Sequence, residues 1–264
     1  MMTHFWTNNI STLYQADARH LPLADASVHC VVTSPPYYAL RSYGDNAAII
    51  GNEQIPGDYV NQLVMVFAEI YRVLRPDGIA WLNLGDSYGG TGQQLGIPWR
   101  VAFALQDNGW TLRSDVIWSK KAPMPESMAG TRYQDGVLRQ GSWRSTSSHE
   151  HIFQLTKGMN YYSDGEAVNT DTQANRRDVW RDISPEPYAG EHFATFPPDL
   201  PRLCIQASTS EAGVCGSCGN QWARVVEHTN ATATSQISGY MDKSGRFDSN
   251  GNSDFLGSSN TTLA

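Results

Sequence analysis

One short stretch constrains the fold of this 264-residue chain more than any other: an apolar run that ends at two adjacent prolines. Val28–Val32 has the β-branched, apolar character of a buried strand, and Thr33–Tyr37, which reads Thr-Ser-Pro-Pro-Tyr, follows it directly. Proline has a fixed φ and no backbone N–H, so two prolines cannot continue a central strand. The chain must therefore leave a sheet at this point.

The rest of the chain alternates predicted helices and strands. Apolar residues at helical spacing predict a helix with Asp58 as its N-cap, and Arg75–Gly78 should end it. The expected helices cover 58–74 and 98–109, and the expected strands cover 28–32, 79–84, 115–118 and 151–155. This order predicts an α/β protein with a doubly wound, mostly parallel sheet. Ligands bind such sheets at the carboxyl ends of strands, which is where the two prolines fall.

Composition sets further limits. Apolar residues make up 40 % of the chain, which is enough for a folded core. No apolar run approaches the roughly 18 residues of a membrane span, and the N-terminus lacks the features of a signal peptide. We therefore expect a cytoplasmic protein that does not enter a membrane. The net charge of −7 disfavours a dedicated nucleic-acid coat protein, but an acidic domain can still carry a local DNA-binding surface.

The Thr-Ser-Pro-Pro-Tyr segment matches the catalytic motif of the β-type site-specific DNA amino-methyltransferases, the cytosine-N4/adenine-N6 DNA methylase family. The Ser form is usual among the cytosine-N4 enzymes, and the adenine-N6 enzymes more often carry Asp. Five further segments resemble the family in the expected order: Tyr38–Gly44, Val73–Gly78, Trp81–Tyr88, Pro123–Ser127 and His192–Pro197. The resemblance spans residues 10–228. It implies a class I methyltransferase, Rossmann-like sheet, circularly permuted so that the catalytic motif precedes the cofactor motif.

The resemblance assigns catalysis to Ser34, Pro35, Pro36 and Tyr37. An aromatic amino group is a poor nucleophile because its lone pair is delocalised into the ring. The Ser34 hydroxyl and the Pro35 carbonyl could accept its two hydrogens and favour a pyramidal nitrogen, provided that these bonds strengthen in the transition state. Tyr37 is expected to stack on a base flipped out of the duplex. An ordinary Pro-Pro loop after a strand is the alternative.

The same resemblance implies S-adenosylmethionine as the cofactor and double-stranded DNA as the partner. The expected cofactor-binding residues are Asp17, Thr33, Phe193, Thr195 and Phe196, of which Asp17 is alternatively an exposed turn residue. The expected DNA-binding residues are Arg41, Lys120, Lys121 and Arg132, from the most basic and aromatic-rich part of the chain. A solvated face of scattered Lys and Arg is equally compatible with that region.

The C-terminal part departs from the family pattern. We expect a methyltransferase domain over 1–210, with 120–149 as an inserted loop and target-recognition candidate, a zinc-ribbon-like knuckle over 211–228, and a flexible Ser/Gly/Asn-rich tail over 229–264. Cys215 and Cys218 resemble one half of a zinc ribbon inserted in some family members, and no second Cys pair follows them. No Gly-rich cofactor loop is found. The interpretation is a chain truncated at its C-terminal end, which is expected to bind S-adenosylmethionine weakly or not at all.

Three functions remain open at this stage. The first is methylation of cytosine N4 in duplex DNA, and the second is methylation of adenine N6 by the same kind of site. The third is a non-catalytic remnant that binds DNA without methyl transfer. Related Pro-Pro-Tyr loops also serve RNA and protein substrates, but the set of neighbouring motifs favours DNA. The recognition sequence and the oligomeric state cannot be read from the chain.

Overall fold

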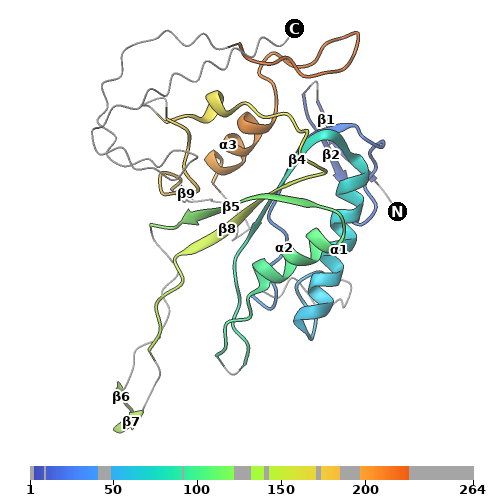
Figure 1. The fold of residues 1–264 in the computed structure, drawn as a ribbon. Coiled ribbons are helices and arrows are strands. Elements are labelled where there is room, and N and C mark those ends of the chain that lie inside the picture. Colours follow the sequence, from blue (N-terminus) through green and yellow to red (C-terminus); the bar gives the residue numbers. More distant parts are fainter. Residues whose placement is uncertain are drawn as a thin grey trace, which may run out of the picture. The chain divides into compact units, whose positions relative to one another are not determined.

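The strand that ends at the two prolines lies at one edge of a five-stranded sheet in the computed structural model (Figure 1). The structure describes residues 3–8, 10–40, 49–90, 92–121, 132–139, 143–170, 174–184 and 197–225. Arg41, Phe193, Thr195, Phe196 and the predicted tail at 229–264 lie outside these residues. Residues 1–224 form one compact unit.

The elements follow the predicted alternation, with additions. The strands are β1 (Thr3–Thr7), β2 (Thr12–Gln15), β3 (Val28–Thr33), β4 (Leu74–Leu84), β5 (Thr111–Ser119), β6 (Arg132–Gln134), β7 (Val137–Arg139), β8 (His149–Thr156) and β9 (Val179–Trp180). The helices are α1 (Pro56–Val73), α2 (Ile97–Asp107), α3 (Asp199–Ser208) and the 3-10 turn η1 (Gly165–Val168). None of the described helices has the length and apolar character needed to cross a membrane.

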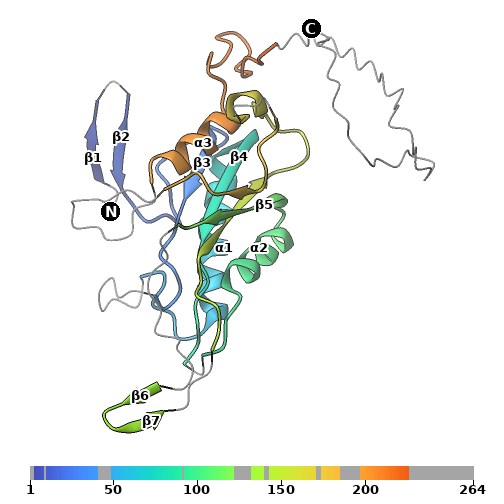
Figure 2. The same cartoon turned by 90° about the vertical axis from the view of Figure 1, so that its left-hand side faces the viewer.

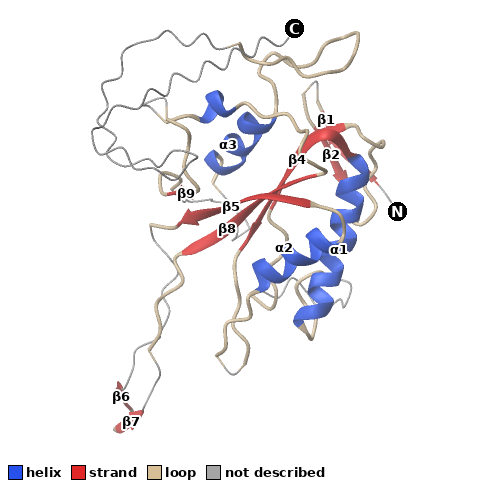
Figure 3. Cartoon of the chain, viewed as in Figure 1, coloured by secondary structure: helices blue, strands red, loops and turns tan. Residues whose placement is uncertain are grey.

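The main sheet has the strand order β3-β4-β8-β5-β9 (Figure 3). β3 and β4 are parallel, as are β5 and β9, but β8 is antiparallel to both β4 and β5. The expected α/β architecture is confirmed: β3, β4, β5 and β9 run in one direction, and among the described strands of this sheet β8 is the exception. Because β8 runs in reverse, its amino end lies beside the carboxyl ends of β4 and β5. β8 can therefore contribute side chains to the edge where a doubly wound sheet binds its ligands.

Helices cover both faces of this sheet. α1 and α2 lie side by side on one face, where Phe67 and Leu105 join a core with Leu82 and Phe153 (Figure 2). α3 packs on the opposite face (Figure 1), where the Trp81 indole N–H donates to Ser208 over 2.7 Å. The central strands are thus covered on both faces by helices. The loops at the carboxyl ends of these strands lie outside the two cores.

Three predicted boundaries move. α1 begins at Pro56, which occupies the first turn and has no N–H to leave unpaired, so Asp58 lies inside the helix rather than at its cap. The helix ends at Val73, and β4 already starts at Leu74. Pairing between β3 and β4 shifts register before Ile79, because Pro76 cannot donate to a ladder and lies in the bulge.

Candidate active site

The Pro-Pro loop is anchored on both sides. The Tyr59 hydroxyl, from α1, donates to the Pro36 carbonyl over 2.9 Å. Ala39 N–H donates to the Gly51 carbonyl over 2.9 Å. Gly51 has a φ of +103°, and a Cβ there would lie 3.2 Å from Pro36 Cβ, so the close approach requires glycine. These contacts fix Ser34, the first residue after β3, at the carboxyl end of the sheet.

A buried hydrogen-bond network continues from Ser34 across three strands. The Ser34 hydroxyl donates to the Tyr37 oxygen over 3.3 Å, and the Tyr37 hydroxyl donates to Glu150 Oε2 over 2.7 Å. Asn83 Nδ2, near the end of β4, donates to the Tyr37 oxygen over 2.9 Å and to Glu150 Oε2 over 2.7 Å. Burial, together with the charge of Glu150, raises the pKa of Tyr37 well above its usual range. The phenol therefore stays protonated and serves as a hydrogen-bond donor.

Asn83 and Glu150 join this network, and the sequence analysis singled out neither of them. Both are buried, with 2 % and 8 % of their surface exposed. A polar side chain in an apolar strand was the available signal, because Asn83 interrupts the run Trp81–Leu84 and Glu150 precedes the run in β8. The signal does not reveal that the two side chains meet, which depends on β8 lying beside β4 in reverse direction.

The two predicted DNA-binding lysines have different surroundings. The Lys120 ammonium forms an ion pair with Glu150 Oε1 and lies 5.0 Å from the centroid of the Trp118 ring. The charge of Lys120 is therefore already balanced by a carboxylate of the protein. Lys121 is exposed, and its ammonium donates to the Ser184 hydroxyl over 3.3 Å. Arg132 is described only through the backbone pairing of β6 with β7, and Arg41 lies outside the described residues.

Asp86, two residues after the end of β4, has a structural role. Its carboxylate accepts backbone N–H groups from Ser87 over 2.8 Å, from Gly96 over 3.0 Å and from Ile97 over 2.8 Å. Gly96 and Ile97 form the start of α2, where the first amides have no partner within the helix. Asp86 therefore caps α2 and closes the loop that connects it to β4.

The described cofactor candidates are Asp17 and Thr33. Asp17 forms an ion pair with Arg19, at 2.7 Å between Oδ2 and Nη2, and the Arg19 hydrogen bonds lower the pKa of Asp17 to about 2. Thr33 is the half-buried last residue of β3. Asn83 Oδ1 is buried and accepts no hydrogen bond from the described residues. An unused acceptor beside the catalytic loop fits a ligand with hydrogen-bond donors, and S-adenosylmethionine carries an ammonium group and an adenine amino group.

Comparison with protein families matches residues 28–216 of the chain to a family described as DNA methylase. The match includes the Pro-Pro loop, both helices of the first face, β8 and α3. The chain belongs to the DNA methylase family.

Individual relatives agree with this membership. The Type II methyltransferase M.Cfr9I of Citrobacter freundii is 42 % identical over 237 residues, which cover 76 % of this methylase and 73 % of the relative. The Type II methyltransferase M.SmaI of Serratia marcescens is 40 % identical over 218 residues, covering 70 % of each chain. Among solved structures, the PvuII DNA methyltransferase (cytosine-N4-specific) matches with a TM-score of 0.59 at 20 % identity, covering 76 % of this chain and 71 % of the other. This last likeness concerns the fold alone.

The Cys knuckle of this DNA methylase is folded. Cys215 N–H donates to the Asn220 carbonyl and Gly219 N–H to the Cys215 carbonyl, each over 2.8 Å, and Gly219 has a φ of +72°. Backbone N–H groups of Cys218 and Ser217 lower the pKa of the Cys215 thiol. Among the described residues, no group of three or more His, Cys, Asp or Glu side chains could hold a metal ion. The two-cysteine zinc site remains a prediction.

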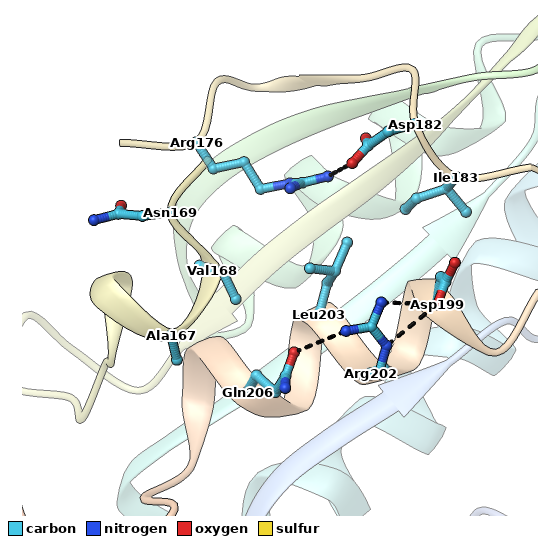
Figure 4. Close-up of a pocket in the computed structure, with 10 residues that line it drawn as sticks. All are labelled: Ala167, Val168, Asn169, Arg176, Asp182, Ile183, Asp199, Arg202, Leu203 and Gln206. Carbon is cyan, nitrogen blue, oxygen red and sulfur yellow. Dashed lines mark hydrogen bonds and ion pairs between the residues drawn. The ribbon is translucent and has the colours of Figure 1, made fainter. Parts of the chain in front are cut away.

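A separate polar hollow of about 250 Å³ lies between α3, η1 and the segment around β9 (Figure 4). Arg176 pairs with Asp182 at 2.5 Å and Arg202 with Asp199 at 2.8 Å, so both guanidinium groups are neutralised within its wall. None of the described catalytic candidates lines it. The hollow is therefore distinct from the Ser34 site.

Proposed function

We propose that this DNA methylase transfers a methyl group from S-adenosylmethionine to the N4 amino group of a cytosine in double-stranded DNA. The observation that carries the proposal is the position of Ser34. It directly follows a sheet strand at its carboxyl end, in a loop that two prolines and the Tyr59 hydroxyl hold in place. The Ser form of the motif, which is usual among cytosine-N4 enzymes, favours cytosine over adenine.

The proposed chemistry depends on the loop's acceptors. Ser34 Oγ and the Pro35 carbonyl would accept the two hydrogens of the amino group. That favours a pyramidal nitrogen whose lone pair is free to attack an electrophile. S-adenosylmethionine supplies such an electrophile, a methyl group on a sulfonium sulfur. The loop is already fixed by contacts to α1 and to Gly51, so little reorganisation is needed when the base arrives.

The remaining predicted contacts complete the proposal. Thr33 and Asp17, with Phe193, Thr195 and Phe196, are assigned to the cofactor. Lys121, Arg41 and Arg132 are assigned to DNA phosphates. The Tyr37 ring is assigned to stacking on the flipped base, while its hydroxyl points to Glu150. The half-zinc knuckle at Cys215 and Cys218 is assigned a structural metal.

The test is product analysis of methylated DNA. The protein is incubated with S-adenosylmethionine and DNA of varied sequence, the DNA is digested to nucleosides, and the products are identified by mass spectrometry. N4-methylcytosine is expected. N6-methyladenine would overturn the base assignment but retain methyl transfer. DNA binding without any methylated nucleoside would contradict the enzymatic function and favour a non-catalytic DNA-binding protein.

Ser34→Ala is the matching variant. Loss of a hydrogen bond made in the transition state should lower the transfer rate by roughly 100-fold or more, with folding unchanged. Ser27→Ala, at the opposite end of β3, is the control, because the Ser27 hydroxyl donates to the Ala24 carbonyl away from the loop. Equal activity in the Ser34 and Ser27 variants would refute the role of Ser34.

A further inference from the structure

The network around Tyr37 contains one group that cannot donate. An ionised carboxylate only accepts hydrogen bonds, and the Lys120 ammonium lies against Glu150 as its counter-charge. The single proton of the Tyr37 hydroxyl is therefore committed to Glu150 Oε2, at 2.7 Å. Any other polar contact of the Tyr37 oxygen must be one in which this oxygen accepts.

Asn83 fixes the same direction. Its Nδ2 lies 2.7 Å from Glu150 Oε2 and 2.9 Å from the Tyr37 oxygen, and only the amide nitrogen can donate to a carboxylate. Turning the amide over would place two acceptors against each other. The Tyr37 oxygen thus accepts from Asn83, and its remaining neighbour, the Ser34 hydroxyl at 3.3 Å, must donate to it.

The consequence reaches the reacting group. With its proton directed to Tyr37, Ser34 Oγ has only lone pairs left, and it meets an incoming amino group as an acceptor. The opposite orientation would aim the Ser34 proton at the amino nitrogen and occupy the lone pair that must attack the methyl group. The direction of one hydroxyl therefore separates a productive contact from an inhibitory one.

We propose that Glu150, held by Asn83 and neutralised by Lys120, is a positioning residue that acts through Tyr37 to keep the Ser34 hydroxyl in its hydrogen-bond-accepting orientation. This inference rests on the proposed methyl transfer. It assigns Tyr37 a second role. Because its hydroxyl donates to the Glu150 carboxylate on β8, its oxygen accepts the proton of Ser34 in the loop after β3. The phenol can do so because burial keeps it protonated.

Kinetics test the role. In Glu150→Gln the side chain can both donate and accept, so the direction of the network is lost. We expect kcat to fall roughly 10- to 100-fold, the loss of a hydrogen bond to a charged group, while KM for DNA stays within about twofold. Tyr37→Phe keeps the ring but removes the link, and it should lower kcat to a similar extent. Adding Glu150→Gln to Tyr37→Phe should then have little further effect.

Glu166→Gln is the matched control, since Glu166 is exposed in η1 and its carboxylate accepts from Asn169. Unchanged kcat in Glu150→Gln would overturn the proposal. Additive losses in the double variant would overturn it too, because they would show that Glu150 does not act through Tyr37. If Glu150→Gln fails to fold, kcat of Tyr37→Phe, which keeps the packing of the ring, is the measurement. Unchanged kcat in that variant would overturn the proposal.

A second readout does not need activity. In protein labelled with 13C at the tyrosine Cζ, the signal missing from Tyr37→Phe is assigned to Tyr37. Its shift reports the hydrogen bond that the hydroxyl donates, so it should move in Glu150→Gln and not in Glu166→Gln. A shift unaffected by Glu150→Gln would refute the network. Absence of methylation by the wild-type protein would instead contradict the proposed function, whatever the 13C result.

Discussion

Lys120 and Lys121 are adjacent in the sequence, but their ammonium groups have different surroundings in the structure. Lys120 neutralises buried Glu150, whereas Lys121 is exposed and touches only a hydroxyl group among its described contacts. Lys121→Ala should therefore reduce the slope of log affinity against log salt for DNA by about 0.9, the release of one counterion. Lys120→Ala should leave the slope unchanged and lower turnover.

The measurement is a salt titration of DNA binding for both variants beside the wild type. The proposed phosphate contact of Lys121 would be wrong if its variant kept the wild-type slope. If Lys120→Ala flattened the slope as much as Lys121→Ala, Lys120 would be a phosphate contact as well as the counter-charge of Glu150.

Gly85 controls the room available to the Tyr37 ring. A Cβ at this position would lie 2.8 Å from Tyr37 Cε2 and 3.5 Å from Glu150 Cγ. Gly85→Ala should displace the ring, lower transfer activity and destabilise the fold by about 1–3 kcal/mol through overpacking. Gly90→Ala, where nothing lies within 4 Å of the added Cβ, is the control in urea unfolding and activity assays. Comparable stability and activity of both variants would contradict this account.

At the scale of elements, Asp86 joins the catalytic edge of β4 to the start of α2. It accepts three backbone N–H groups, two of them from the helix start. Asp86→Ala should lower the free energy of unfolding by about 1–2 kcal/mol, the usual cost of a lost N-terminal cap. Asp107→Ala, at the exposed carboxyl end of the same helix, should change it by less than about 0.5 kcal/mol. Chemical denaturation compares the two, and equal losses would argue against a capping role.

Glu69, in the carboxyl half of α1, binds the segment between β2 and β3. Its carboxylate accepts from the Arg72 guanidinium at 2.6 Å and from Leu21 N–H at 2.8 Å, and the Arg72 bonds lower its pKa from 4.5 to about 2. A lowered folded-state pKa stabilises the fold above the unfolded value, and that contribution is lost as pH falls through the folded value. Glu69→Gln should be less stable than wild type at pH 6, with the gap closing between pH 4.5 and pH 2. Thermal unfolding across this range measures it, and a gap independent of pH would contradict the linkage.

Some elements could be predicted from the sequence, whereas the direction of one strand could not. Val28–Thr33 and the α1 face were predictable because apolar periodicity and paired prolines are local signals. The direction of β8 was not, since the alternation of a strand is the same read either way. For the same reason Glu150 was missed: it meets Tyr37 across 113 residues of sequence, through a pairing that only the folded sheet creates. The backbone N–H groups at the start of α2 that bind the Asp86 carboxylate are equally invisible in the sequence.

At the scale of the whole molecule, the strand that leads into the Pro-Pro loop, β3, lies at an edge of the described sheet. β3 pairs with β4 alone among the described strands, and all six of its residues are half-buried. β4 and β8 each have neighbours on both sides and are largely buried. The loop that carries Ser34 thus extends from a less protected strand, whereas its partners Asn83 and Glu150 belong to the rigid centre.

Hydrogen exchange should reveal the difference in backbone protection between the edge strand β3 and the central strands β4 and β8. Amides of β4 and β8 are expected to exchange most slowly, close to the rate set by global unfolding, because opening them requires disruption of both layers. Amides of β3 that do not face β4 should exchange much faster, since an edge strand leaves alternate N–H groups without a ladder partner. Exchange followed by mass spectrometry with overlapping peptides separates the three strands. Protection of β3 equal to that of β4 would mean that another segment pairs with this edge, and the catalytic loop would then be supported from both sides.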